Sequence, residues 1–267
     1  VRGGKTMRGL KGKNAVITGA AKGIGRGIAQ RFAQEGVHVF MADVLADEVK
    51  KQAEDIAKTY GVKAEGYPVD LTDNEQIEAM MARASESFGS IDILVCNAGI
   101  TIHNWATDYP IEDIDKVFAL DLRGYYLCAR TAARYMKKQG KGNIVMISSA
   151  NSVIYHSKRS LYNVSKAAVA GMAGTLGVEL ARFGIRVNAL GPGYVATDLV
   201  KNGVANGTIK MERNFEVIPE KRFIEVAEIA SVAAFLASDE SSAINGQNIL
   251  ADLGWSKNAL PEDQDMA

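Results

Sequence analysis

The chain has 267 residues, which suits one large domain or two small ones and leaves ample length to bury a core. Hydrophobic residues make up 47% of it and charged residues 23%, as in ordinary globular proteins. Lys plus Arg equals Asp plus Glu at 31 each, and this zero net charge argues against a nucleic-acid-binding protein, which usually carries a basic excess.

From the sequence, we expect neither a membrane span nor a secretory signal. No apolar run approaches the ~20 residues that a membrane helix needs. The basic N-terminus lacks the apolar core of a secretory signal, and Met7 is interpreted as the native start. Cys96 and Cys128 lie in apolar segments and are expected to be buried thiols, so we expect a cytoplasmic protein. The three histidines show no metal-ligand spacing, so no metal is expected.

Apolar strand-like segments alternate with helical patterns along the chain. The expected strands cover 14–18, 37–42, 62–69, 91–96, 143–148, 185–190 and 247–251. The expected helices cover 23–35, 45–59, 73–88, 112–138, 160–183 and 225–237. This alternation predicts a single α/β domain, a Rossmann-like doubly wound parallel sheet of about seven strands with helices on both faces.

The predicted domain runs from 11 to 254 and is one NAD(P)-binding catalytic unit. Residues 1–10 and 255–267 are expected to be tails. The stretch 194–222 is long and polar, and it contains two glycines and three asparagines. Stretches of that length are usually lids or disordered, so we expect a substrate lid there.

The first strand is followed by the glycine-rich sequence TGAAKGIGRGIA, at the point where the first helix begins. Gly19, Gly23 and Gly25 there permit a tight turn and let backbone N–H groups approach a pyrophosphate at the helix N-terminus. The placement between strand and helix therefore predicts a dinucleotide-binding turn that also contains Lys22 and Ile24. A glycine-rich turn without a ligand is the alternative.

The second strand ends in an acidic residue that bears on the choice of cofactor. Asp43, eighteen residues after Gly25, can accept hydrogen bonds from an adenosine ribose and would repel a 2′-phosphate, which favours NAD over NADP. Lys22 favours NADP, because a cation in the turn could pair with that phosphate. We give Asp43 more weight than Lys22 as an indicator of the cofactor, because Val44 after it supplies no second cation. Asp70, at the end of the third strand, is expected to cap the next helix or to border adenine.

Tyr162 and Lys166 stand four residues apart in the sequence SLYNVSKAAVAG. On a helix this spacing places both side chains on one face. A free phenol ionises near pH ~10, and a neighbouring ammonium lowers its pKa. A tyrosine so tuned can give or take a proton in catalysis. Two ordinary surface neighbours are the alternative.

Three motifs together carry a family resemblance: TGAAKGIG, CNAG at 96–99, and Tyr162-x-x-x-Lys166. In this order and setting they resemble the short-chain dehydrogenase/reductase family, over nearly all of 11–254. The resemblance implies a nicotinamide cofactor and hydride transfer between it and an alcohol or carbonyl carbon. It also implies roles for positions that match the family's cofactor motifs. These are Gly19, Gly23, Ile24 and Gly25 at the phosphates, Asp43 at the ribose, Asp70 and Leu71 beside adenine, Asn97 and Gly99 at the adenosine side, and Val195 and Thr197 at the nicotinamide amide.

The resemblance also assigns the reacting groups. Tyr162 would be the general acid/base, and Lys166 would tune it and hold the nicotinamide ribose. Ser149, thirteen residues before Tyr162, falls on the family's catalytic serine and would hydrogen-bond the substrate oxygen. The alternative for Ser149 is a strand-end serine satisfied by the backbone.

One position departs from the family pattern, which usually has Asn where this chain has Asp121. An acid here falls on an apolar helix stripe, where a buried charge is costly, so it is expected to be functional or tightly paired. We expect Asp121 to keep the proton-relay role of that Asn and to stabilise Lys166 as a cation. A helix-kink residue with its own partner is the alternative. The stripe consists of Ile114, Phe118, Asp121, Tyr125 and Cys128.

The segment between Ser149 and Tyr162 leaves a strand at the edge of the sheet where ligands bind. It contains His156, Lys158 and Arg159, a polar set that suits a small polar substrate such as a polyol, a sugar derivative or a hydroxy acid. We expect His156 or Arg159 to contact that substrate. The alternative is that these side chains point into water.

The sequence is also compatible with two other functions. Lys22 favours an NADPH-dependent ketone or 3-oxoacyl reductase, and the same fold could serve a non-catalytic NAD(P)-sensing protein. The resemblance implies a homo-oligomer, a dimer or a tetramer, formed through the helices 112–138 and 160–183. Small residues on the second helix (Ala170, Ala173 and Gly177) would allow close approach of another helix, or could equally pack on the chain's own sheet.

Overall fold

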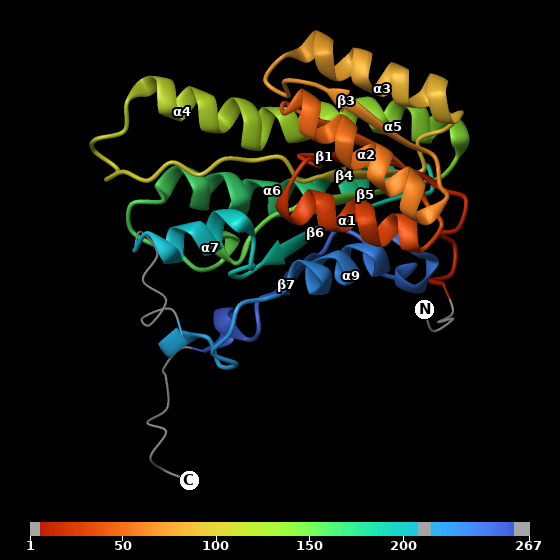
Figure 1. The fold of residues 1–267 in the computed structure, drawn as a ribbon. Coiled ribbons are helices and arrows are strands. Elements are labelled where there is room, and N and C mark those ends of the chain that lie inside the picture. The colour runs from red at the N-terminus through yellow and green to blue at the C-terminus, as the bar shows by residue number, and fades with distance from the viewer. Residues whose placement is uncertain (1–5, 208–214, 259–267) are drawn as a thin grey trace.

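The computed structural model describes residues 6–207 and 215–258. Its centre is a seven-stranded sheet with the strand order β3-β2-β1-β4-β5-β6-β7, in which all neighbours run parallel (Figure 1). This confirms the predicted fold class. The strands are β1 (Asn14–Thr18), β2 (His38–Asp43), β3 (Ala64–Pro68), β4 (Ile93–Cys96), β5 (Gly142–Ile147), β6 (Ile185–Pro192) and β7 (Asn248–Ala251).

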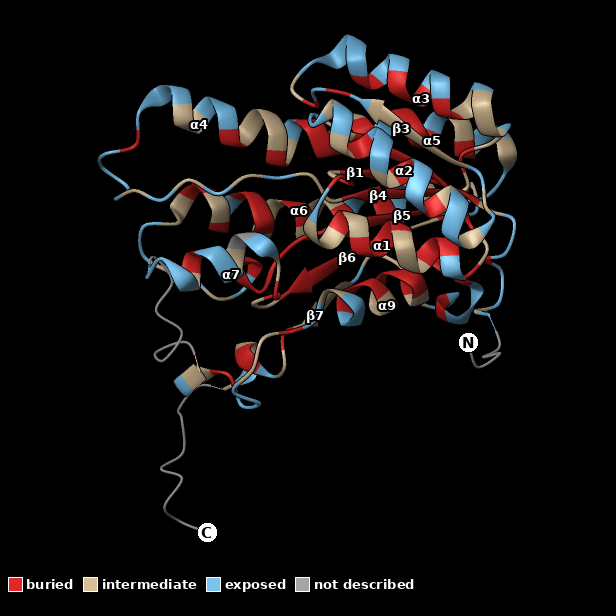
Figure 2. Ribbon diagram, viewed as in Figure 1, coloured by how far each residue is buried: buried red, intermediate tan, exposed pale blue. Residues whose placement is uncertain are grey.

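Helices cover both faces of the sheet and bury an apolar core on each. One core joins the sheet to α1 (Gly23–Gln34), α2 (Ala46–Tyr60) and α9 (Val226–Ala237). The other joins it to α3 (Asn74–Phe88), α5 (Tyr125–Gln139) and α6 (Ser160–Ala181). Figure 2 shows buried residues along the central strands and on the sides of the helices that face them. Strands buried on both faces are near-continuously apolar, which is why β1 and β4 were recognisable as short hydrophobic runs.

The strand order reverses direction between β1 and β4, and this position defines the functional edge of the sheet. In open parallel sheets, ligands bind outside the carboxyl ends of the strands at such a switch point. The segments that follow β1, β4, β5 and β6 all leave the sheet at this edge, where β6 ends and α7 (Asp198–Ala205) begins in Figure 1.

The predicted helix 112–138 is present as one unbroken helical stretch over 111–139, but it is not α-helical throughout. It consists of α4 (Ile111–Phe118), a π-helical segment over Ala119–Gly124, and α5. A π-helical turn holds more residues than an α-helical turn, and no residue type in the sequence marks where it occurs. Such segments are frequent at functional sites, and this one contains Asp121.

Packing extends beyond the predicted domain boundaries at both ends. Leu10 has no exposed surface, and Trp255, in the short 3₁₀-helix Trp255–Lys257, is 6% exposed. Neither residue therefore belongs to a tail. Residues 1–5 and 259–267 of the expected tails, and 208–214 of the expected lid, lie outside the described residues.

The unusual sequence ADLGW near the C-terminus has a backbone consequence. Leu253 adopts φ +56°, a left-handed conformation that favours glycine, and its side chain packs against the cluster around Trp255. The chain therefore places an apolar side chain where the backbone alone would favour none.

Two kinds of feature are absent from the described ranges, 6–207 and 215–258. No helix in them is both long and apolar enough to cross a membrane. No three or more His, Cys, Asp or Glu side chains in them are grouped to hold a metal ion.

Candidate active site

The glycine-rich turn between β1 and α1 has backbone angles and close backbone contacts that require glycine. Gly19 and Gly23 have φ of +64° and +55°. A Cβ atom at Gly25 would lie 2.2 Å from the carbonyl oxygen of Gly19, so only glycine fits there. Lys22, the N-cap of α1, makes no side-chain capping hydrogen bond, and the first N–H groups of a helix need partners. The turn therefore presents backbone donors suited to a phosphate.

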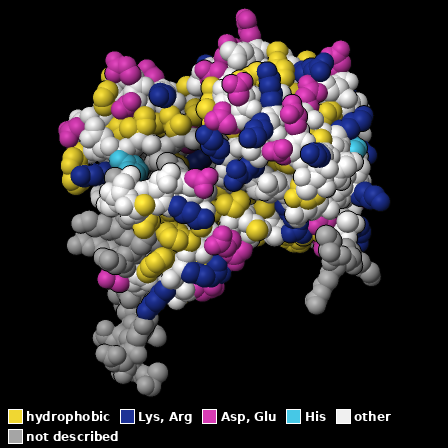
Figure 3. Space-filling model, in the orientation of Figure 1, with side chains coloured by type: hydrophobic (Ala, Val, Ile, Leu, Met, Phe, Trp, Pro, Cys, Tyr) yellow, Lys and Arg dark blue, Asp and Glu magenta, His cyan; other side chains and the backbone are white. Residues whose placement is uncertain are grey.

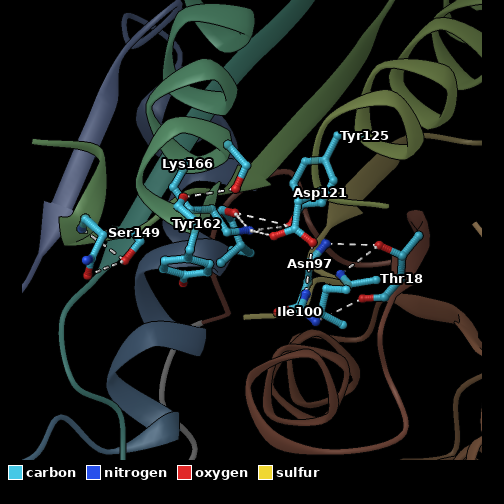
Figure 4. A network of polar contacts seen from close by, with 12 residues as sticks. Thr18, Asn97, Ile100, Asp121, Tyr125, Ser149, Tyr162 and Lys166 are labelled. Atoms are coloured by element: carbon cyan, nitrogen blue, oxygen red, sulfur yellow. Dashed lines mark hydrogen bonds and ion pairs between the residues drawn. The ribbon is translucent and has the colours of Figure 1, made fainter. Parts of the chain in front are cut away.

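Asn97 fixes this turn from the end of the neighbouring strand. Its Nδ2 donates to the carbonyl oxygens of Thr18 and Gly19, both at 3.0 Å, and its backbone N–H donates to the Thr18 hydroxyl at 2.9 Å (Figure 4). Gly99, two residues later, lies over a different group. A Cβ atom there would approach Asp121 Oδ2 to 3.1 Å and Lys166 Nζ to 3.2 Å. The CNAG motif thus contacts the glycine turn at one end and a buried ion pair at the other.

Two acidic residues modify the charge at the end of β2. The Asp43 carboxylate accepts hydrogen bonds from the backbone N–H groups of Ala21 at 2.9 Å and Leu45 at 3.0 Å, which holds it beside the glycine turn. Lys22 Nζ lies 3.2 Å from Glu48 Oε1, on the first turn of α2. The hydrogen bond from Lys22 lowers the pKa of Glu48 below its usual value. The cation that favoured NADP therefore has a carboxylate partner.

The structure corrects one of the two expectations for Asp70. The N-cap of α3 is Asp73, whose carboxylate accepts from the backbone N–H of Gln76, so Asp70 does not cap this helix. Asp70 is exposed after β3 and accepts two hydrogen bonds from Thr72. Leu71 beside it is 6% exposed. A place next to adenine remains a prediction for both.

The segment after β6 lies next to the glycine turn. Val195 pairs with Ile224 in an isolated bridge, and Thr197 is the N-cap of α7, accepting from the backbone N–H of Val200 at 3.4 Å. A Cβ atom at Gly23 would lie 3.4 Å from the Thr197 methyl group. The structure therefore brings this predicted cofactor segment next to the phosphate turn.

The predicted reacting groups come together at the same edge of the sheet. Tyr162 and Lys166 share a face of α6, with Lys166 Nζ 5.6 Å from the centre of the Tyr162 ring. Ser149 follows β5 and is 7% exposed. In Figure 4 the Tyr162 ring lies between Ser149 and the Lys166 ammonium.

The Lys166 ammonium is buried and surrounded by hydrogen-bond acceptors. It is 3.4 Å from Asp121 Oδ2, and it donates to the Tyr125 hydroxyl at 3.4 Å and to the Ile147 carbonyl oxygen at 3.3 Å. Burial alone would lower the pKa of Lys166, but attraction to Tyr125 and Asp121 outweighs burial and raises it above the ordinary lysine value. Lys166 is therefore a cation across the neutral range.

Asp121 is fully buried, and it has both a backbone partner and a charged partner. Its Oδ1 accepts from the backbone N–H of Ile100 at 2.9 Å, its Oδ2 pairs with Lys166, and it lies in the π-helical segment. Burial raises the pKa of Asp121, and the Lys166 ammonium opposes this only in part. Within the described residues Oδ2 makes no hydrogen bond, although it faces the ammonium.

The serine hydroxyl is part of a network that sequence reasoning missed. Ser149 Oγ accepts from the backbone N–H of Asn151 at 3.1 Å, so the alternative of a serine satisfied by the backbone holds in part. His156 does not point into water: its ring lies 3.1 Å from Asn151 Nδ2 and stacks on Trp255, with ring centroids 5.3 Å apart. Burial, helped by the charge of Arg159, lowers the pKa of His156.

The basic residues of the substrate segment have different surroundings. Lys158 Nζ lies over the Trp105 ring, 4.7 Å from its centre. Arg159 is half-buried. The pKa of His103 is lowered mainly by burial of its imidazole, and in addition by the positive charge of Arg159. Figure 3 shows the surface hollowed beside α4, with Lys or Arg and His side chains at the margin of the hollow. Arg159 thus lies near two histidines and has no ion-pair partner among the described residues.

Comparison with known proteins agrees with this geometry. A sequence model of the family described as Enoyl-(Acyl carrier protein) reductase matches residues 19–256. The chain belongs to the short-chain dehydrogenase/reductase family. These are oxidoreductases with NAD(P) cofactors. A crystal structure of a short-chain type dehydrogenase/reductase from Mycobacterium marinum superposes with a TM-score of 0.86 at 35% identity, covering 92% of this chain and 96% of that one.

Curated relatives differ in substrate and cofactor. D-beta-hydroxybutyrate dehydrogenase of Rhizobium meliloti is 34% identical, over 91% of this chain and 98% of its own. NAD-dependent glycerol dehydrogenase of Listeria innocua is 37% identical, over 91% and 93%. A probable NADP-dependent mannitol dehydrogenase of Yarrowia lipolytica is also 37% identical, over 92% and 88%. Family membership therefore fixes neither the substrate nor the choice between the two cofactors.

Proposed function

We propose that the chain is an NAD-dependent dehydrogenase that transfers hydride between NAD and a secondary alcohol or carbonyl group of a small polar substrate. The observation that carries this proposal is the arrangement of Tyr162 beside Ser149, with the buried Lys166 cation 5.6 Å from the phenol ring. A sensor of NAD would need none of these three side chains in this arrangement.

The residues fit a nicotinamide dinucleotide. Gly25 allows the turn to pack closely, since a Cβ atom there would clash with the carbonyl oxygen of Gly19, and the uncapped first turn of α1 offers N–H donors to the pyrophosphate. Asp43 would hold the adenosine ribose, while Val195 and Thr197 would hold the nicotinamide amide. When bound, the cofactor supplies the acceptor for hydride.

Tyr162, Ser149 and Lys166 divide the remaining chemistry. In the oxidation direction Tyr162 takes the proton of the substrate hydroxyl as the carbon loses hydride, and in reduction it returns that proton. Ser149 donates a hydrogen bond to the substrate oxygen and stabilises charge developing there. The Lys166 ammonium stabilises negative charge on the phenol oxygen and would also hold the nicotinamide ribose. We propose that Asp121 keeps that ammonium charged and accepts from water in the proton path.

The experiment that tests the proposal combines binding and turnover. Calorimetry with NAD and NADP measures cofactor binding, and absorbance of reduced nicotinamide follows turnover of polyols, hydroxy acids and keto acids. We expect NAD to bind and to be reduced with at least one alcohol. Binding without turnover of any compound would indicate a sensing protein, and turnover only with NADPH and keto substrates would favour the reductase alternative suggested by Lys22.

We expect Glu48 to contribute to the preference for NAD. Glu48→Gln removes the carboxylate that occupies Lys22 and frees the ammonium for a 2′-phosphate. Because this ion pair is exposed and therefore weak, the Kd of NADP is expected to fall only about 2- to 5-fold with no change for NAD, as measured by calorimetry. In a Lys22→Met background the same change should have no effect. An equal gain in both backgrounds would show that Lys22 is not the group involved.

Arg159 is expected to select substrates with an anionic end. A hydrogen bond to a charged group is worth about 1.5–3 kcal/mol, so Arg159→Ala should raise KM for hydroxy acids about 10- to 100-fold and leave neutral polyols unchanged. Lys158→Ala is the matched control, because Lys158 lies on Trp105. Equal changes in KM for both substrate classes would contradict this role.

We also propose a cytoplasmic homo-oligomer, a dimer or tetramer built on the outer face of α4 to α6. An apolar groove there is lined by Phe118, Leu122, Tyr126 and Met172, among others. Val178 on α6 is an apolar residue that is 79% exposed, as expected of a side chain that another subunit would cover. The small residues considered for this contact belong largely to the chain's own packing: Ala173 is buried in the core and Gly177 lies against Gly246.

A further inference from the structure

Two buried asparagines connect the turn that carries Ser149 to the helix that carries Tyr162. Asn151 Nδ2 lies 2.9 Å from Asn163 Oδ1 and 3.1 Å from His156 Nδ1. Asn163 Nδ2 in turn donates to the backbone carbonyl oxygen of His156 at 3.1 Å. We name Asn151, Asn163 and His156 the asparagine clasp.

The clasp satisfies its polar atoms inside the protein. Asn151 is 4% and Asn163 is 6% exposed, so water is largely excluded. Both donors of the Asn151 carboxamide are used, and the Asn163 carboxamide both donates and accepts. Because Asn151 donates to His156 Nδ1, that ring nitrogen is the acceptor and the imidazole is neutral. Fully satisfied buried networks rigidify the segments that they join, and a broken one leaves costly unpaired groups.

Each asparagine is also tied to a reacting residue. Asn151 donates its backbone N–H to Ser149 Oγ at 3.1 Å, and its Oδ1 lies 3.5 Å from the same hydroxyl. Asn163 directly follows Tyr162 on the first turns of α6. Between the two reacting residues, Val153 and Tyr155 are 50% and 70% exposed and contribute little packing, whereas Ile154 packs with Ala150 and Trp255.

The clasp is also supported from the far end of the chain. The His156 ring stacks on Trp255, and Trp255 stacks on Tyr194 with centroids 4.9 Å apart. Asp252 accepts from the backbone N–H groups of Gly254 and Ser256, which holds the turn that presents Trp255. The imidazole is thus held by an aromatic stack as well as by Asn151.

We propose that Asn151 and Asn163 are positioning residues that set the distance and orientation between the Ser149 hydroxyl and the Tyr162 phenol. Both groups must reach one substrate oxygen, and a misplacement of about 1 Å can cost about 100-fold in rate. The clasp is a direct side-chain link between the two segments that carry them. This inference rests on the proposed function, in which Ser149 and Tyr162 act on the same oxygen.

The test measures the rate of hydride transfer per cofactor site in Asn151→Ala, Asn163→Ala and the double variant. Sites are counted by calorimetry with NAD, and single turnovers are followed by the absorbance of reduced nicotinamide. We expect each single variant to lose about 10- to 100-fold in rate per site, with the Kd of NAD unchanged. The double variant should lose no more than the worse single one, because either change opens the clasp. A merely structural role would reduce the number of sites and leave the rate per site intact.

Two further variants keep the inference falsifiable. Asn143→Ala is the matched control, because Asn143 is equally buried and donates to Leu236 from the opposite end of β5. Asn163→Asp keeps an acceptor for Asn151, but it loses the donation to His156 and buries a carboxyl group, so any rate that it recovers over Asn163→Ala reports the contact with Asn151. Rates per site that equal those of the parent, or losses that multiply in the double variant, would overturn the inference. A parent that binds NAD but turns over no substrate would instead refute the proposed function.

Discussion

Tyr162→Phe is expected to lose about 100- to 10,000-fold in kcat while the protein stays folded and binds NAD. General acid–base catalysis by one positioned side chain is worth about this factor. Within the described residues, no hydrogen bond holds the Tyr162 hydroxyl, so its removal should cost little stability. The phenylalanine ring keeps the face over which Lys166 lies. Steady-state kinetics, calorimetry with NAD and thermal unfolding together separate loss of chemistry from loss of fold.

A matched change on the same protein tests whether any lost hydroxyl has this effect. Tyr126→Phe removes a phenol from the outer face of α5, where Tyr126 is 49% exposed, and should leave kcat unchanged. Undiminished turnover in Tyr162→Phe would remove the general acid/base from the proposed mechanism. Loss of NAD binding in parallel with kcat would mean that the ring, rather than proton transfer, is what matters.

The parts of the site that could be predicted from the sequence are local ones. The glycine turn is encoded in seven consecutive residues, because left-handed φ at Gly19 and Gly23 and the close approach at Gly25 each require glycine at a fixed place. The pair Tyr162 and Lys166 follows from helical geometry alone. The parallel sheet follows from the alternation of apolar strands with helices, and its order places these local motifs at one edge.

The contacts that could not be predicted join residues far apart in the sequence. Glu48 pairs with Lys22 because α2 packs beside α1, and no motif signals such a pair. Trp255 reaches His156 from the last described turn of the chain, which the sequence pattern assigned to a tail. Asn151 and Asn163 are twelve residues apart, and no helix or strand periodicity relates them. Their hydrogen bond therefore depends on where β5 ends and α6 begins. Tyr125 was visible only as an apolar stripe residue, although its hydroxyl contacts Lys166.

Asp121 is the site residue whose replacement should most change stability and pH dependence together. Asp121→Ala leaves the Lys166 ammonium buried without its carboxylate, and removal of one partner of a buried pair typically costs about 3–5 kcal/mol. Asp121→Asn keeps an acceptor for the N–H of Ile100, now held by Oδ1 at 2.9 Å, and should cost less. Thermal and urea unfolding of the two variants measure this difference.

The sign of the pH effect follows from Lys166. Its pKa is raised in the folded protein, so the favourable charge contributes fully below the unfolded lysine value of about 10.4 and is lost as the pH rises through the folded value. Asp121→Asn removes one of the causes that raise this pKa, while burial, which lowers it, remains. Activity at alkaline pH should therefore fall away at lower pH in Asp121→Asn than in the parent.

The kinetic test compares pH profiles of kcat for the parent, Asp121→Asn and Asp121→Ala. Both variants should lose turnover, with Asp121→Ala the slower, because an alanine neither pairs with Lys166 nor accepts from water in the proton path. Asp115→Asn, on α4 and facing the outer groove, controls for loss of one negative charge nearby. If both Asp121 variants match the parent across the whole pH range, the buried carboxylate only stabilises the π-helical segment, and Tyr125 and the Ile147 carbonyl suffice to hold the lysine.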